Sequence, residues 1–177
     1  MYISCKGNVL QQIHETEWQC RMLSKGMSKP EYWVWLKTVT TEDDNGVKSY
    51  DFSGEDYEII ETDAPLSFTE TIDGKEVEKS FYETDYIHSN PVSGTHYHLK
   101  YVDNKIVKDD ASLKDCQDKA MWAAVRKTRD MKLEETDYLA LQDQPSMADN
   151  MKNYRKNLRN VPQDQSDPYN ITWPSKP

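Results

Sequence analysis

Three short turn sequences place the strongest constraint on how this chain folds. Asn45-Gly46, Asp73-Gly74 and Asp103-Asn104 each separate two segments that are rich in β-branched and aromatic residues. These turn residues tolerate the positive φ angles of tight hairpins, so each turn predicts two antiparallel strands. The predicted strands cover residues 32–40 with 47–52, 67–72 with 75–82, and 96–102 with 105–108. Three hairpins in succession indicate an antiparallel sheet, a sandwich or a small barrel.

A long helix is predicted after the last hairpin. Ser112 can cap a helix that begins at Leu113 and continues to about Glu134. Leu113 and Cys116 lie on the apolar face of this predicted helix. We therefore expect Cys116 to be a small, unreactive core residue, because burial raises the pKa of a thiol.

A second, shorter helix is predicted nearer the C-terminus. Met147, Met151, Tyr154 and Leu158 follow one another at spacings of four, three and four residues, which places them on one stripe of a helix. Pro162 is expected to end this helix. Residues 163–177 are polar and contain further prolines, so they are predicted to be extended.

These patterns predict an α+β protein with three segments. Residues 1–30 are expected to be an N-terminal arm or a short helix, because Gly26 and Pro30 interrupt the apolar pattern. Residues 31–110 are expected to form an antiparallel β domain built from hairpins. Residues 111–177 are expected to form a helical hairpin with an extended C-terminal tail.

Charge is distributed unevenly along the chain. Residues 1–110 carry 11 Lys and Arg against 21 Asp and Glu, a net charge of −10, whereas residues 111–177 carry 11 against 10. An acidic surface repels nucleic acid, whose binding requires clustered cations. We therefore expect no nucleic-acid partner. The acidic part favours solubility or contact with a basic protein surface.

The sequence shows no membrane-spanning run of apolar residues, so we expect no membrane partner. Its start lacks the basic and apolar regions of a secretory signal. Cys5, Cys20 and Cys116 form no C-x-x-C pair, which indicates reduced thiols in a protein made in a cytoplasm.

Catalytic motifs are missing from the sequence, which contains no G-x-S-x-G, P-loop, G-x-G-x-x-G or H-E-x-x-H. Its many carboxylates are the expected content of an acidic surface. We therefore predict that the protein is not an enzyme and has no catalytic residues.

One group of residues has the character of metal ligands. His88, His96 and His98 lie close in sequence, and residues two apart in a strand project from the same face. His96 and His98 could therefore share one metal ion. The alternative is a pair of solvated or hydrogen-bonded histidines on a strand. No other cofactor is expected.

The last fifty residues contain a fixed order of ordinary residues. It runs from Arg129-Asp130, Leu133 and Thr136-Asp137-Tyr138 through Asp143-Gln144-Pro145 to Tyr154-Arg155, Leu158-Arg159 and Trp173-Pro174-Ser175-Lys176-Pro177. Residues 126–177 thereby resemble the tail assembly chaperone domain of bacteriophage tail proteins, whose pattern is R-D-x-x-L-x-x-T-D-[WY], D-x-P, Y-R-x-x-L-R and W-P-x-x-P.

This resemblance implies a non-enzymatic bacteriophage tail protein that binds other tail proteins. It could be a permanent part of the virion tail, fibre or baseplate, or a transient assembly chaperone in the host cytoplasm. A homo-oligomer is compatible with either role. The expected partner-binding residues are Tyr138, Leu141, Met151, Tyr154, Arg155, Leu158 and Trp173.

A different class of function is a carbohydrate-binding accessory of a tail fibre. Trp33 and Trp35 lie two residues apart in a predicted strand, so they could form one aromatic platform for sugar rings or part of the core face. A sugar-binding platform requires both rings to be exposed, whereas a core face requires them to be buried.

Overall fold

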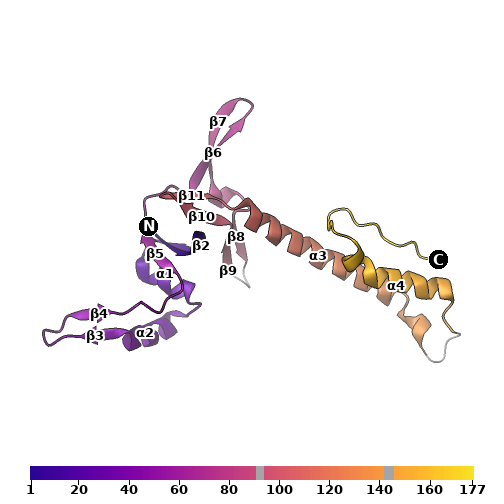
Figure 1. Cartoon of the computed structure of the whole chain (residues 1–177), viewed down its shortest axis with the longest axis horizontal. Helices are drawn as coiled ribbons and strands as arrows, with labels where there is room; N and C mark the ends of the chain where they lie inside the picture. The colour runs from indigo at the N-terminus through magenta and orange to yellow at the C-terminus, as the bar shows by residue number, and fades with distance from the viewer. Residues whose placement is uncertain (91–93, 142–145) are drawn as a thin grey trace. The chain divides into compact units, whose positions relative to one another are not determined.

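The computed structural model describes residues 1–90, 94–141 and 146–177 (Figure 1). The chain divides into two compact units, Met1–Leu113 and Lys114–Pro177. An antiparallel β-rich N-terminal region is followed by helices, which confirms the predicted α+β class. The Asp-x-Pro part of the C-terminal pattern, at residues 143–145, lies outside the described residues.

A five-stranded antiparallel sheet forms the centre of the first unit. Its strand order is β11-β10-β2-β1-β5. The strands are β1 (Tyr2–Lys6), β2 (Val9–His14), β5 (Glu58–Glu61), β10 (Leu99–Val102) and β11 (Lys105–Lys108). Strand β2, near the start of the chain, therefore pairs with β10, near the end of this unit.

Three further two-stranded hairpins belong to the first unit. They are β3 (Thr40–Glu42) with β4 (Lys48–Tyr50), β6 (Ser67–Ile72) with β7 (Lys75–Ser80), and β8 (Ile87–Asn90) with β9 (Gly94–Tyr97). A short 3-10 helix, η1 (Phe81–Glu83), follows β7. Asp73, Gly74, Asp103 and Asn104 have positive φ, and Gly46 also does. The turns at Asp73-Gly74 and Asp103-Asn104 are therefore confirmed, whereas Asn45-Gly46 lies within a longer loop, residues 43–47, between β3 and β4.

The helices are α1 (Glu17–Ser24), α2 (Lys29–Thr38), α3 (Asp110–Glu134) and α4 (Asp149–Asp164), with a 3-10 turn, η2 (Asp137–Ala140), before α4. Pro162 lies inside the last turn of α4 rather than ending it. Because Pro162 has no N–H to donate to the carbonyl four residues earlier, it weakens the end of the helix, and α4 ends two residues later at Asp164.

The first fourteen residues form strands, not the expected arm or short helix. Gly7-Asn8 is a two-residue turn between β1 and β2, and Gly7 has a φ of 59°. Gly-Asn between two apolar segments is a recognised hairpin signal, so this turn could have been predicted from the sequence. Ile3 and Leu10 are at most 1% exposed, because their strands lie at the centre of the sheet.

The predicted strand at residues 32–40 is wrong, because most of this segment is helix α2. Ser28 and Glu31 form a capping box at its start, and the backbone N–H of Ser28 donates to Glu31 Oε2 over 2.8 Å. Pro30 occupies the first helical turn, where its missing N–H costs nothing. This local start signal overrides the β propensity of the aromatic residues that follow.

Helix α3 begins three residues earlier than predicted. The carboxylate of Asp109 accepts a hydrogen bond from the Ser112 backbone N–H over 3.2 Å, so Asp109 rather than Ser112 caps the helix. Cys116 is exposed, which corrects the prediction of a core thiol. The buried residue of this helix is Val125, so the apolar face is rotated from the predicted one.

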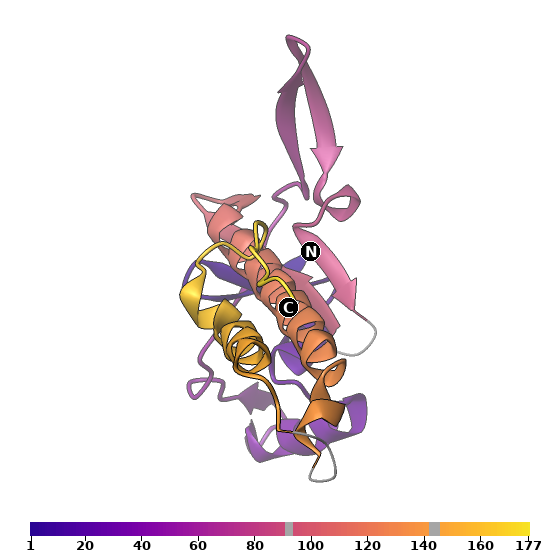
Figure 2. The ribbon, with the colours of Figure 1, turned by 90° about the vertical axis from the view of Figure 1, so that its right-hand side faces the viewer.

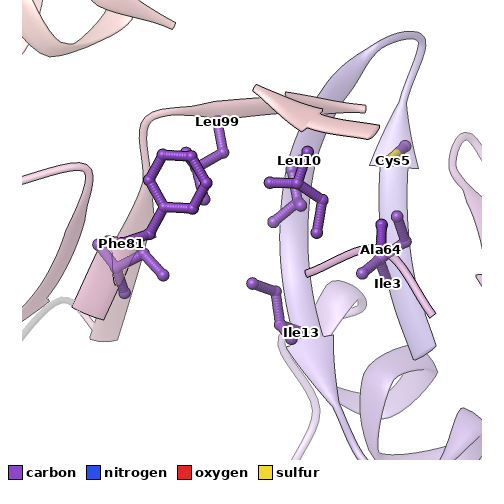
Figure 3. Close-up of a cluster of buried hydrophobic side chains, with 9 residues drawn as sticks. Ile3, Cys5, Leu10, Ile13, Ala64, Phe81 and Leu99 are labelled. Carbon is purple, nitrogen blue, oxygen red and sulfur yellow. The ribbon is translucent and has the colours of Figure 1, made fainter. Parts of the chain in front are cut away.

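The hydrophobic core of the first unit joins residues distant in sequence. Figure 3 shows Leu10 and Ile13 of β2 beside Leu99 of β10 and Phe81 of η1. Phe81 and Leu99 are both 0% exposed. The short 3-10 helix after β7 therefore anchors its neighbouring hairpins to the central sheet.

The position of Leu10 leads to a stability prediction. Leu10→Ala should destabilise the first unit by about 2–5 kcal/mol, because the cavity left behind adds to the lost burial. Urea denaturation would measure the change. Val34→Ala is the control, because Val34 is 66% exposed and its truncation should change stability by less than about 0.5 kcal/mol. Equal effects of both changes would contradict this core.

The three cysteines should differ in reactivity. Burial raises the pKa of Cys5 and of Cys20 to about 11, whereas Cys116 is exposed. A maleimide should therefore label one thiol of the native protein and three of the denatured protein, as counted by mass spectrometry. The variant Cys116→Ser should abolish native labelling, and rapid labelling of Cys5 or Cys20 would contradict the fold.

Candidate partner-binding surface

The second unit is an antiparallel pair of helices. Helix α4 runs beside the second half of α3 in both views of the molecule (Figures 1 and 2). Tyr154, Leu158 and Val161 of α4 are buried at spacings of four and three residues, so α4 buries one apolar face within the unit. Val125 of α3 is also buried, and it lines a pocket with Ile171 and Trp173 of the C-terminal tail.

Arg155 forms a buried network with the chain between the two helices. Its Nη1 donates to the carbonyl oxygen of Leu133 over 2.8 Å and to Oγ1 of Thr136. Its Nη2 pairs with Oδ1 of Asp137 over 2.6 Å. Thr136 is 0% exposed, and its hydroxyl also donates to the Leu133 carbonyl. We call Arg155, Thr136, Asp137 and this carbonyl the Arg155 network.

The network determines where the chain turns after α3. A buried guanidinium needs hydrogen-bond acceptors, and these three acceptors pair with both of its terminal nitrogens. Leu133 and Thr136 are consequently held at the end of α3, and η2 begins at Asp137. Arg155 was predicted to bind a partner, but its side chain is instead used within the unit. The sequence feature that could have predicted this network is the position of Arg155, next to Tyr154 at the edge of the apolar stripe of α4.

The turn η2 presents two apolar side chains to solvent. Tyr138 is 58% exposed and Leu141 is 57% exposed. Met131, one turn before the end of α3, is 49% exposed. These three side chains lie next to the Arg155 network in the sequence. We call Tyr138 and Leu141 the η2 surface.

The predicted partner-binding residues therefore divide into three groups by exposure. Tyr154, Arg155 and Leu158 are at most 8% exposed and hold the unit together. Met151 and Trp173 are half-buried. Tyr138 and Leu141 are more than half exposed, so they are the two members that a partner can contact over a large area.

The C-terminal tail packs against its own unit. The side chain of Gln165 donates to the Thr172 carbonyl over 2.9 Å and accepts from the Thr172 N–H over 2.7 Å. Lys132 Nζ lies 5.6 Å from the ring centre of Trp173, and Lys176 pairs with Glu135 over 3.6 Å. Trp173, predicted as an interface anchor, thus has contacts within the chain.

The three histidines occupy different environments. His88 pairs with His96 across β8 and β9, and His96 is exposed. His98 follows the end of β9 and is 7% exposed, with Nδ1 2.9 Å from the hydroxyl of Ser112. Burial lowers the pKa of His98. The described residues contain no group of three or more His, Cys, Asp or Glu placed to hold a metal ion.

The predicted platform of Trp33 and Trp35 has the wrong geometry. Both residues lie in α2, and residues two apart on a helix point to different sides. Trp33 is 43% exposed, whereas Trp35 is half-buried and stacks on Phe52. Of the two rings, Trp33 offers the larger exposed surface.

Comparison with known proteins identifies the C-terminal region. Residues 122–177 match the family of phage tail assembly chaperone proteins, which confirms the resemblance predicted for residues 126–177. No curated protein and no solved structure matches the chain. The matched residues include the Arg155 network and the η2 surface. The match supports a role in phage tail assembly and interaction with other tail proteins, and this family is of a non-enzymatic kind.

No helix in the described part of the chain is long and apolar enough to cross a membrane.

The Arg155 network leads to a second stability prediction. Arg155→Ala should destabilise the second unit by about 2–4 kcal/mol, because it leaves buried acceptors without their donor. The expected destabilisation is smaller than that for breaking a fully buried ion pair, because the Asp137 side chain is 61% exposed. Hydrogen exchange at residues 133–137 and urea denaturation would measure the effect.

Arg159→Ala is the matched control, since Arg159 lies one turn further along α4 and is exposed. It should change stability by less than about 0.5 kcal/mol. Arg155→Lys should behave like the alanine variant, because an ammonium cannot reproduce the planar arrangement of donors. If the amides of residues 133–137 in Arg155→Ala exchanged as slowly as in the wild type, the network would be refuted.

Proposed function

We propose that this protein acts without catalysis in phage tail assembly and binds another tail protein through its η2 surface. The observation that supports this proposal is the pair of exposed apolar side chains, Tyr138 and Leu141, next to a buried network. Tyrosine is enriched among residues that dominate binding energy at protein interfaces. Exposed apolar side chains close together often mark such interfaces.

Rigidity of the turn supports the same role. Arg155 fixes the end of α3 and the first residue of η2, so little conformational freedom is lost when a partner binds. The exposed tyrosine has few rotatable bonds, which further limits the entropic cost. A short turn held in this way can present the same two side chains before and after binding.

The proposed location is the virion tail, or the host cytoplasm during assembly. A permanent component and a transient chaperone both require a partner for the η2 surface. They differ in whether the protein stays in the virion after the tail is assembled. Mass spectrometry of purified virions separates the two forms of the proposal. Fixed stoichiometry in the virion supports a structural component, and its absence from virions supports a chaperone.

The η2 surface should be required for binding. Tyr138→Ala and Leu141→Ala should each weaken capture of tail proteins from infected cells by about tenfold, while the unfolding midpoint stays unchanged. Affinity purification with quantitative mass spectrometry would measure capture.

Tyr82→Ala is the matched control, because Tyr82 is 60% exposed in the first unit. Its capture of tail proteins should equal that of the wild type. Unchanged capture by the double variant Tyr138→Ala, Leu141→Ala would contradict the proposed surface, as would an equal loss in Tyr82→Ala.

A further inference from the structure

A groove of about 500 Å³ lies in the first unit between α2 and the β3–β4 hairpin. Trp33 of α2 and Tyr50 of β4 line it. Trp33 is 43% exposed and Tyr50 is 48% exposed. Exposure of two large aromatic rings in one concave site is unusual for a surface with no ligand, because their burial would stabilise the fold.

A second ring stacks on each of these aromatic side chains. Trp33 stacks on Trp18, with ring centres 5.8 Å apart and planes inclined by 30°. Tyr50 stacks on Phe52, with ring centres 5.9 Å apart and planes inclined by 4°. Stacking covers one face of each ring and restricts its rotation. The groove therefore has two preorganised aromatic surfaces.

Polar groups of both kinds share the groove with these rings. Lys37 and Lys48 supply ammonium donors, and Glu42 supplies carboxylate acceptors. Glu42 Oε2 lies 4.0 Å from Lys48 Nζ, and both side chains are more than half exposed. A ligand that both donates and accepts hydrogen bonds can bridge such a pair without leaving a charge unpaired.

The charge of the unit indicates a ligand without negative charge. Residues 1–110 carry a net charge of −10, and the loop between β3 and β4 adds Asp43 and Asp44 near the groove in sequence. A net negative charge of this size disfavours phosphorylated, sulfated or carboxylated ligands, and within the groove Glu42 offsets one of the two lysines. A neutral ligand with apolar ring faces and hydroxyl groups fits both this charge and the groove lining.

We propose that this groove binds an uncharged saccharide. The C–H face of a pyranose ring carries partial positive charge and packs on the negative face of an aromatic ring, here Trp33 or Tyr50. Neighbouring hydroxyls donate to Glu42 and accept from Lys37 or Lys48. A proline-rich peptide also packs on aromatic rings, but it has few donors for a carboxylate, so the groove chemistry favours the saccharide.

Binding of the full chain to an array of bacterial surface glycans tests the proposal. The array should include neutral oligosaccharides of glucose, galactose, mannose and N-acetylglucosamine, sialylated and sulfated glycans, and proline-rich peptides. The wild type should bind at least one neutral glycan with a Kd at or below about 1 mM. Trp33→Ala and Tyr50→Ala should each weaken that binding by about tenfold or more.

Matched variants separate binding from folding. Trp33→Phe keeps a stacking ring and should retain most of the affinity, and Tyr82→Ala should retain all of it. Tyr138→Ala should also leave glycan binding unchanged, so this test is independent of the η2 surface. Three outcomes overturn the proposal: no neutral glycan binds, glycan binding survives in both alanine variants, or the groove variants lose a peptide or a charged glycan instead.

Discussion

The second unit depends on one buried cation. Arg155 is 8% exposed, and its donors reach the last turn of α3, a threonine hydroxyl and the first residue of η2. Without those acceptors the guanidinium would pay a large desolvation cost, so α4 can pack on α3 only in a register that supplies them. The position of the turn, and with it the exposure of Tyr138 and Leu141, follows from this requirement.

The first unit uses a buried arginine in a similar way. Arg21 of α1 is 6% exposed, pairs with Glu55, and lies 3.6 Å from the ring centre of Phe52. Because Glu55 and Phe52 follow strand β4, this contact ties the groove-bearing hairpin to helix α1. In both units an arginine that satisfies distant partners holds exposed aromatic residues in place. Polar networks therefore position exposed side chains in both units, in addition to the apolar cores.

Sequence patterns predicted the features that depend on a few neighbouring residues. Asp73-Gly74 and Asp103-Asn104 form turns because their φ angles are positive, and the long helix after residue 110 follows from its length and periodicity. Sequence patterns gave a wrong prediction where two local signals favoured different structures. Residues 32–40 have strand propensity, but the Ser28–Glu31 capping box starts a helix there and turns Trp33 and Trp35 to different sides.

The sequence by itself determined the α+β class, the hairpin turns and the resemblance of the C-terminal region to phage tail assembly chaperones. The tertiary structure decided which of the predicted partner-binding residues are accessible, because burial of Tyr154, Arg155 and Leu158 depends on how α4 packs on α3. It also decided that Tyr50, and not Trp35, lines the groove with Trp33. Spacing along a chain predicts which face a side chain takes, whereas only packing decides whether that face meets protein or solvent.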